Sequence, residues 1–168
     1  MDHNLLRKGQ DEANELWLRA RSPDADPAFL ASMADHEVWF VRRAAAGNRA
    51  TPMEVLDRLA LDKDPSVRWA AAGNTSSSAG TLRRLANDED WDVRYSAAGN
   101  TSTPGDELVR LARDPKILVR FAVVGNESVP ESALGVLLKD DSTNLSKLAK
   151  QRLEELAAKG QKKRLLAS

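Results

Sequence analysis

Side chains with binding chemistry recur in this 168-residue sequence at a fixed interval of 26 residues. Arginine forks bind carboxylates and phosphates, and large aromatic rings provide rigid apolar contact area. The columns contain the arginines Arg42, Arg68, Arg94 and Arg120, the asparagines Asn48, Asn74, Asn100 and Asn126, and the residues Arg43, Trp69, Tyr95 and Phe121. Like groups repeated in rows favour binding, because catalysis requires different groups that converge on one point.

The arginine column has two interpretations. It can form a basic ladder for phosphates or an acidic peptide. It can instead be structural, because an aspartate column precedes the arginines of the next unit by six residues, and ion pairs would tie neighbouring units together. The aspartates of this column are Asp62, Asp88 and Asp114. We favour the structural interpretation.

The aromatic column is the strongest candidate for a binding site. Trp69, for example, lies outside the apolar stripe that Val67, Ala70 and Ala71 form at helical spacing. Rings at one repeat spacing would line a continuous strip on the surface, or would fill the space between successive units. Other large apolar residues stand at the expected helix starts, where we predict core positions: Trp39, Phe40, Trp91, Ile117 and Leu118.

The sequence contains little that could support catalysis. His3 and His36 are the only histidines, and neither has a partner at metal-ligand spacing. Cysteine is absent, which excludes disulfides, thiolate metal sites and thiol catalysis within this chain. No glycine-rich phosphate loop or nucleophile elbow is present. We therefore expect a protein that is not an enzyme and holds no metal or cofactor.

The elements that position these columns are repeated helix pairs. The motifs VRRAAAGN, VRWAAAGN, VRYSAAGN and VRFAVVGN begin at Val41, Val67, Val93 and Val119. Each unit has room for two short helices and two turns, which is typical of stacked helical repeats.

The local signals in one unit predict where its helices begin and end. The first helix is expected at about 65–72, with Gly73 in a left-handed conformation after it. The second is expected to begin with Thr51 as the N-cap, Pro52 in the first turn and Glu54 two residues later. Its predicted core face is Leu56, Leu59 and Ala60.

The chain is predicted to form one all-α domain over 1–168. Residues 1–40 are expected to form an N-terminal cap and a degenerate repeat with a helix near 27–34, and 41–140 the four repeats. A C-terminal cap helix is predicted at 141–159, followed by a frayed basic tail at 160–168. Twenty-five basic residues balance 25 acidic ones, and no apolar run could serve as a signal or membrane segment. We expect a soluble, cytoplasmic protein without membrane insertion.

The repeated unit resembles the leucine-rich repeat variant family. The resemblance covers about 30–140 and rests on VR, an alanine-rich helix ending in GN, a proline near the second helix, and Leu-x-x-Leu before an aspartate. It implies a bacterial all-helical protein, similar to HEAT and armadillo repeats, with a right-handed α-solenoid fold and a binding role. The period is slightly longer than the family's usual unit, and the cysteine-rich iron–sulfur segment of one member has no counterpart.

The expected function is a noncatalytic scaffold that binds a protein or peptide along one face. The asparagine column is a second candidate, since the resemblance to armadillo repeats implies amides that bind the main chain of an extended peptide. The asparagines can instead hold the turn backbone, which is the interpretation we favour. The alternative partner is nucleic acid, bound through the arginine rows and the basic tail.

Overall fold

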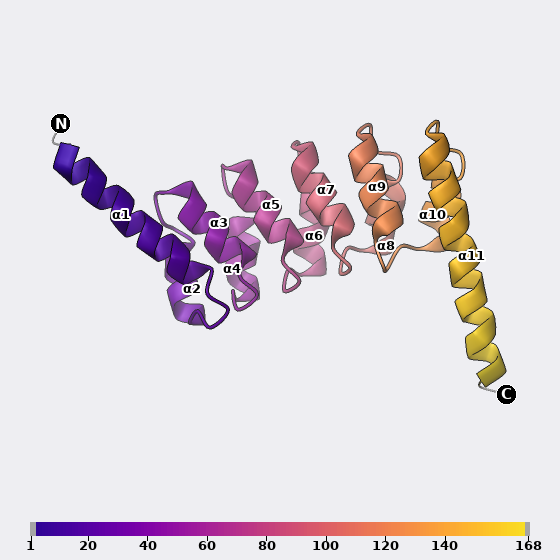
Figure 1. Ribbon diagram of the computed structural model, residues 1–168, viewed down its shortest axis with the longest axis horizontal. Helices are drawn as coiled ribbons and strands as arrows, with labels where there is room; N and C mark the ends of the chain where they lie inside the picture. Colours follow the sequence, from indigo (N-terminus) through magenta and orange to yellow (C-terminus); the bar gives the residue numbers. More distant parts are fainter. Residues whose placement is uncertain (1–2, 167–168) are drawn as a thin grey trace.

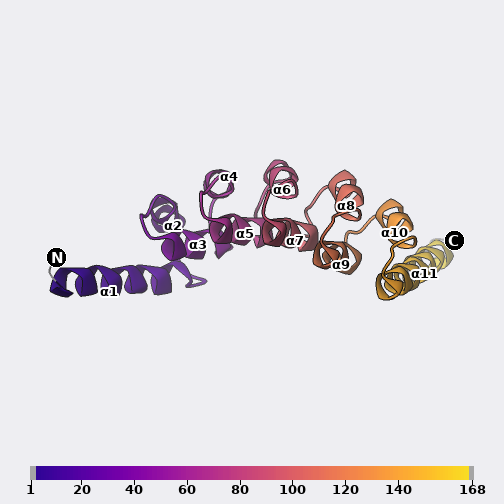
Figure 2. The same cartoon turned by 90° about the horizontal axis from the view of Figure 1, so that it is seen from above.

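The computed structural model describes the backbone of residues 3–166 and the side chains of residues 9–158. Within these residues the structure is entirely helical, and helices adjacent in sequence pack together in two rows (Figures 1 and 2). The inner row contains α1 (His3–Ala20), α3 (Trp39–Gly47), α5 (Pro65–Gly73), α7 (Trp91–Gly99), α9 (Ile117–Gly125) and α11 (Thr143–Leu166). The outer row contains α2 (Pro27–Met33), α4 (Met53–Leu59), α6 (Ala79–Leu85), α8 (Gly105–Leu111) and α10 (Glu131–Leu137).

The inner row lies on the concave side of a shallow arc (Figure 2). Side-chain size explains the direction of bending. The inner helix α5 buries Ala70, Ala71 and Ala72, whereas the outer helix α6 buries Leu82 and Leu85. The distance between packed helices depends on the side chains at the contact, so alanine-rich helices approach more closely. The inner row is therefore the shorter of the two.

The core lies between the two rows and repeats with the sequence period. Val67 of α5 and Leu82 of α6, for example, have no exposed surface. The predicted apolar faces are therefore confirmed. The buried positions include Val41, Val67, Val93 and Val119 on the inner row and Leu56, Leu59, Leu82, Leu85, Leu108, Leu111, Leu134 and Leu137 on the outer row.

A hydroxyl group closes the turn inside three of the four repeats, and Val129 stands at this position in the fourth. The Oγ1 of Thr51 donates a hydrogen bond of 2.6 Å to the carbonyl oxygen of Ala45, and α4 begins two residues later with Pro52 at its N-cap. Ser77 and Thr103 make the corresponding bond in the next units. The prediction that Thr51 caps the second helix is wrong, because its hydroxyl binds the end of the first helix.

The glycine that ends each repeated inner helix has ordinary backbone geometry. No described residue has a positive φ. Gly73 is the last residue of α5, and Asn74 follows it in an extended conformation with φ −73° and ψ 126°. The predicted left-handed conformation of Gly73 is therefore wrong, and the backbone does not require glycine at this position.

The asparagine column joins each repeat to the one before it. The Nδ2 of Asn74 donates to the carbonyl oxygens of Ala46 at 2.8 Å and Asn48 at 2.7 Å. Its Oδ1 accepts from the amide of Ser76 at 2.9 Å. Both donors are used and the side chain is buried, so this amide is not available to a peptide. The same three bonds are made by Asn48, Asn100 and Asn126.

The arginine column joins successive loops of the array. Arg68 donates to the two carboxylate oxygens of Asp88 at 2.7 and 2.9 Å, and to the carbonyl oxygen of Asp62 at 2.9 Å. The carboxylate partner thus lies 20 residues after the arginine, whereas the aspartate six residues before contributes its backbone carbonyl. Corresponding ion pairs join Arg42 to Asp62, Arg94 to Asp114 and Arg120 to Asp140. A continuous series of bonds therefore runs along the repeats.

The two ends of the array extend its inner row. At the N-terminus, α1 and α2 form a helix pair, and α2 spans Pro27–Met33 as predicted for the degenerate repeat. At the other end, α11 continues to Leu166, past the expected limit at 159. Side chains of the predicted basic tail lie outside the described residues. No helix within residues 3–166 combines the length and apolarity needed to cross a membrane.

Removing one asparagine bridge tests its contribution to the fold. Asn74→Ala should lower the free energy of unfolding by about 1–3 kcal/mol, because the carbonyl of Ala46 loses the Asn74 donor. The carbonyl of Asn48 keeps its hydrogen bond from the amide of Thr51. Urea unfolding followed by circular dichroism measures the change. The control is Arg49→Ala, a neighbouring exposed side chain, which should change stability by less than about 0.5 kcal/mol. Equal effects of the two substitutions would contradict this role.

The last ion pair of the arginine column should make stability depend on pH. Hydrogen bonds from Arg120 and from the amide of Ser142 hold the pKa of Asp140 below its ordinary value, despite burial. Because this pKa is lower in the folded than in the unfolded chain, the stabilisation is present above about pH 4 and is lost as the pH falls through the folded pKa. Urea unfolding at several pH values should show lower stability for Asp140→Asn near neutral pH and a weaker decline in acid. Parallel pH profiles for the two proteins would refute the assignment.

Candidate functional site

The candidate binding surface is the solvent-facing side of the inner row. The aromatic column places Trp69 on α5, Tyr95 on α7 and Phe121 on α9. Trp69 is 37% exposed and Tyr95 41% exposed, while Phe121 is partly buried. The rings therefore contact neighbouring helices and still present apolar surface along the concave side of the arc.

A further ring extends this column by one unit. Trp17 of α1 stands 26 residues before Arg43, and it lines the same hollow as Arg43 and Trp69. The 26-residue period alone could have predicted Trp17 as a member of the column. It was not predicted, because the VR motif that marks the other members is absent from the N-terminal unit. We refer to Trp17, Trp69, Tyr95 and Phe121 as the aromatic strip.

Several residues predicted for the core add to the exposed apolar surface. Trp39 is 43%, Ile117 41% and Leu118 50% exposed, so their predicted burial is wrong. These residues stand in the first turn of an inner helix, α3 or α9. Phe40 and Trp91 are only partly buried. Among the described residues, Met53 is exposed to a similar extent on the outer row, as are Leu61 and Leu138 just after the outer helices α4 and α10.

Shallow hollows lie beside the rings where the helices carry glycine. Tyr95, Phe121, Gly99 and Gly125 border an open hollow of about 470 Å³ between α7 and α9. A Cβ atom added at Gly99 or Gly125 would meet no atom within 4 Å. Neither backbone conformation nor packing requires glycine at these two positions, and its effect is to leave space beside the rings.

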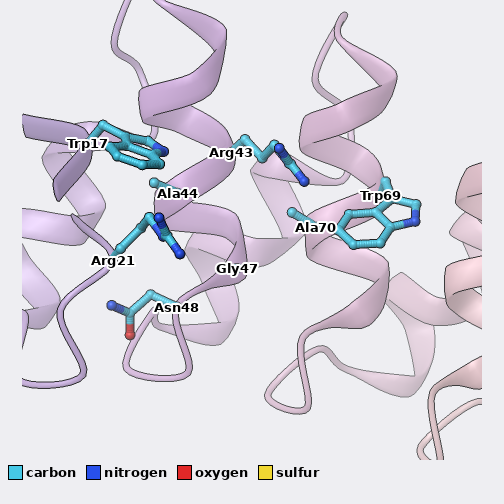
Figure 3. Close-up of a pocket in the computed structure, with 8 residues that line it drawn as sticks. All are labelled: Trp17, Arg21, Arg43, Ala44, Gly47, Asn48, Trp69 and Ala70. Carbon is cyan, nitrogen blue, oxygen red and sulfur yellow. The ribbon is translucent and has the colours of Figure 1, made fainter. Parts of the chain in front are cut away.

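The N-terminal end of the strip combines rings with cations. A hollow of about 380 Å³ lies at this end, and its lining includes Trp17, Ala44, Gly47 and Trp69. Figure 3 shows these lining residues. Arg43 lies over the ring of Trp69, with its guanidinium carbon 5.4 Å from the ring centroid. The guanidinium carbon of Arg21 lies 4.6 Å from the ring centroid of Trp17. Both arginine–tryptophan contacts are therefore within the distance of a cation–π interaction.

The other predicted site residues take part in the fold. The asparagine column is buried and hydrogen bonded, so we remove it from the candidate surface. The arginine column is engaged with aspartates, and side-chain exposure of its ion-paired members is as low as 7% at Arg42. A nucleic-acid surface would therefore have to use other basic groups. Within the described residues, no group of three or more histidine, aspartate or glutamate side chains could hold a metal ion.

Comparison with models of protein families gives no match, and comparison with curated proteins gives none either. The resemblance to the leucine-rich repeat variant family therefore stays a prediction that rests on the repeated motifs. The function has to be argued from the surface itself.

Substituting the glycines tests whether they serve the fold. Gly99→Ala should raise the free energy of unfolding by about 0.5–1 kcal/mol, because the helical backbone suits alanine and the new methyl group meets open space. Gly73→Ala is the comparison, because its Cβ would lie 3.0 Å from Ser96 Oγ. This variant should therefore gain less unfolding free energy than Gly99→Ala. Thermal unfolding measures both. Destabilisation by Gly99→Ala would show that the fold requires this glycine.

Proposed function

We propose that the protein is a noncatalytic scaffold, a right-handed α-solenoid of the leucine-rich repeat variant type, that binds a protein or peptide segment along its inner face. The observation that carries the proposal is the concentration of exposed large apolar side chains on one row of helices. These are Trp39, Trp69, Tyr95, Ile117, Leu118 and Leu148. Large apolar side chains exposed on one face are typical of interaction sites.

The physical advantage of such a surface is that it is formed before the partner arrives. The buried asparagine and arginine bonds fix each helix relative to the next, so the rings need little ordering on binding. Tryptophan and tyrosine supply large contact areas with few rotatable bonds and are enriched among residues that dominate binding energy. Modest contacts from consecutive repeats can then add along one partner chain.

The size of the strip sets the length of segment that it fits. Packed helices lie about 8–10 Å apart, so the four steps from Trp17 to Phe121 span about 32–40 Å. An extended chain covers about 3.3 Å per residue, which corresponds to a segment of about 10–12 residues.

Selection from a random peptide library tests this function. Peptides of about 12 residues selected on the wild-type protein should bind Trp69→Ala/Tyr95→Ala at least about tenfold more weakly, since the variant lacks two rings of the strip. Fluorescence anisotropy measures the affinities. Both rings are substantially exposed, so circular dichroism should show an unchanged helical fold.

The matched control removes exposed apolar side chains from another surface. Met53 and Leu61, which are 49% and 67% exposed, lie on and just after the outer helix α4. Met53→Ala/Leu61→Ala should bind the selected peptides as the wild type does. Failure to select any peptide, or equal affinity of the wild type and the Trp69→Ala/Tyr95→Ala variant, would refute the proposal.

A further inference from the structure

Two arginines at one end of the aromatic strip have no anionic partner among the side chains that the structure describes. Arg21 follows α1 and Arg43 lies on α3, and neither forms an ion pair with any described residue. This differs from Arg42, which lies on the same helix as Arg43 and whose guanidinium is held by Asp62 in the loop after α4. The ring contacts with Trp17 and Trp69 are the interactions that position the two free cations.

Both cations line the same hollow. Its wall contains Trp17, Arg21, Arg43 and Trp69, and no acidic side chain contributes to it (Figure 3). Two positive charges that share a partly enclosed site repel one another, and a bound anion would relieve this repulsion. The hollow is therefore electrostatically suited to a negatively charged group.

The stacking of each guanidinium on a ring suits this role. An arginine that lies over an aromatic face keeps N–H donors at the edge of its plane, and these donors match the two oxygens of a carboxylate. The small residues Ala44 and Gly47 between the rings leave room for such a group to approach. The site thus combines a cationic fork with apolar walls.

The adjacent surface limits where an acidic group can lie. Beyond Trp69, a second hollow is lined by Asp90 and Asp92 as well as Arg43, and neither aspartate forms an ion pair with Arg43. Their charge disfavours another acid at this point. Further along, Tyr95 and Phe121 border an apolar hollow. The inner face is therefore cationic at its N-terminal end, acidic in the middle and apolar beyond.

We propose that the hollow formed by Trp17, Arg21, Arg43 and Trp69 binds an aspartate or glutamate side chain of the partner segment. The apolar residues of the same segment lie on Tyr95 and Phe121. The two hollows are about two and a half helix spacings apart, or about 20–25 Å, which corresponds to about six to eight extended residues. This inference rests on the proposed function and specifies the chemistry of its partner.

Parallel peptide selections test the inference. The probe is a random library of about 12-residue peptides, applied to the wild type, to Arg21→Gln/Arg43→Gln and to the control Arg49→Gln/Arg84→Gln. The control removes two exposed arginines without an ion pair among the described residues, so the change in net charge is the same. The wild type and the control should enrich Asp or Glu about six to eight residues from an apolar pair. The Arg21→Gln/Arg43→Gln protein should keep the apolar pair and lose the acid.

A binding cycle with one selected peptide then tests the contact itself. Replacing its acidic residue with the amide should weaken binding to the wild type at least about tenfold and leave binding to Arg21→Gln/Arg43→Gln unchanged. Equal weakening with both proteins would overturn the inference, because the acid would then act elsewhere.

The outcomes separate this inference from the proposed function. Selected peptides that carry apolar residues without acid enrichment would overturn the inference and leave the scaffold function standing. Failure to select any peptide would refute the scaffold function. An oligothymidylate that displaces the selected peptide, and whose own binding is lost in Arg21→Gln/Arg43→Gln, would reassign the hollow to nucleic-acid phosphate.

Discussion

The fold depends on the amide bridge from each asparagine to the carbonyl oxygens of the preceding repeat. The bond from Asn74 to Ala46 and Asn48 fixes the distance and rotation between two repeats in a buried place where water cannot replace it. A lost bridge removes the donor of the Ala46 carbonyl, whereas the Asn48 carbonyl keeps the amide of Thr51, so packings that break the bridge are disfavoured. Because the same bridge recurs in four units, the inner helices follow one another in a regular row.

Within each repeat, the arginine and asparagine columns hold the fold together, and the position after the arginine forms the surface. Arginine and asparagine stand unchanged in the four VR motifs, because their hydrogen bonds demand one geometry. The position directly after the arginine instead holds Arg43, Trp69, Tyr95 and Phe121. No bond between repeats requires a particular residue there, so this position can differ from unit to unit. A regular scaffold can thereby carry an irregular surface, which a specific partner requires.

Because this position varies, the two ends of the inner face differ in chemical character. Its N-terminal end pairs rings with Arg21 and Arg43, whereas the end near Phe121 is largely apolar. Glycine beside the rings leaves open space, and alanine between the helices brings the row together on the concave side. The same choice of small residues therefore shapes both the arc and the hollows along it.

The sequence by itself determined the repeat length, the helix pairs and the core positions, because a period of 26 residues with helical apolar spacing leaves no other packing for Val67 and the leucines of α4 and α6. It could not decide which aspartate pairs with Arg68. Asp62 lies six residues before it and Asp88 lies 20 residues after, and these separations add up to one period, so both recur equally in every unit. Only the packed structure shows which loop approaches the guanidinium. The exposure of Trp39 likewise depends on which neighbouring helices reach its side chain, and a periodic sequence pattern does not contain this information.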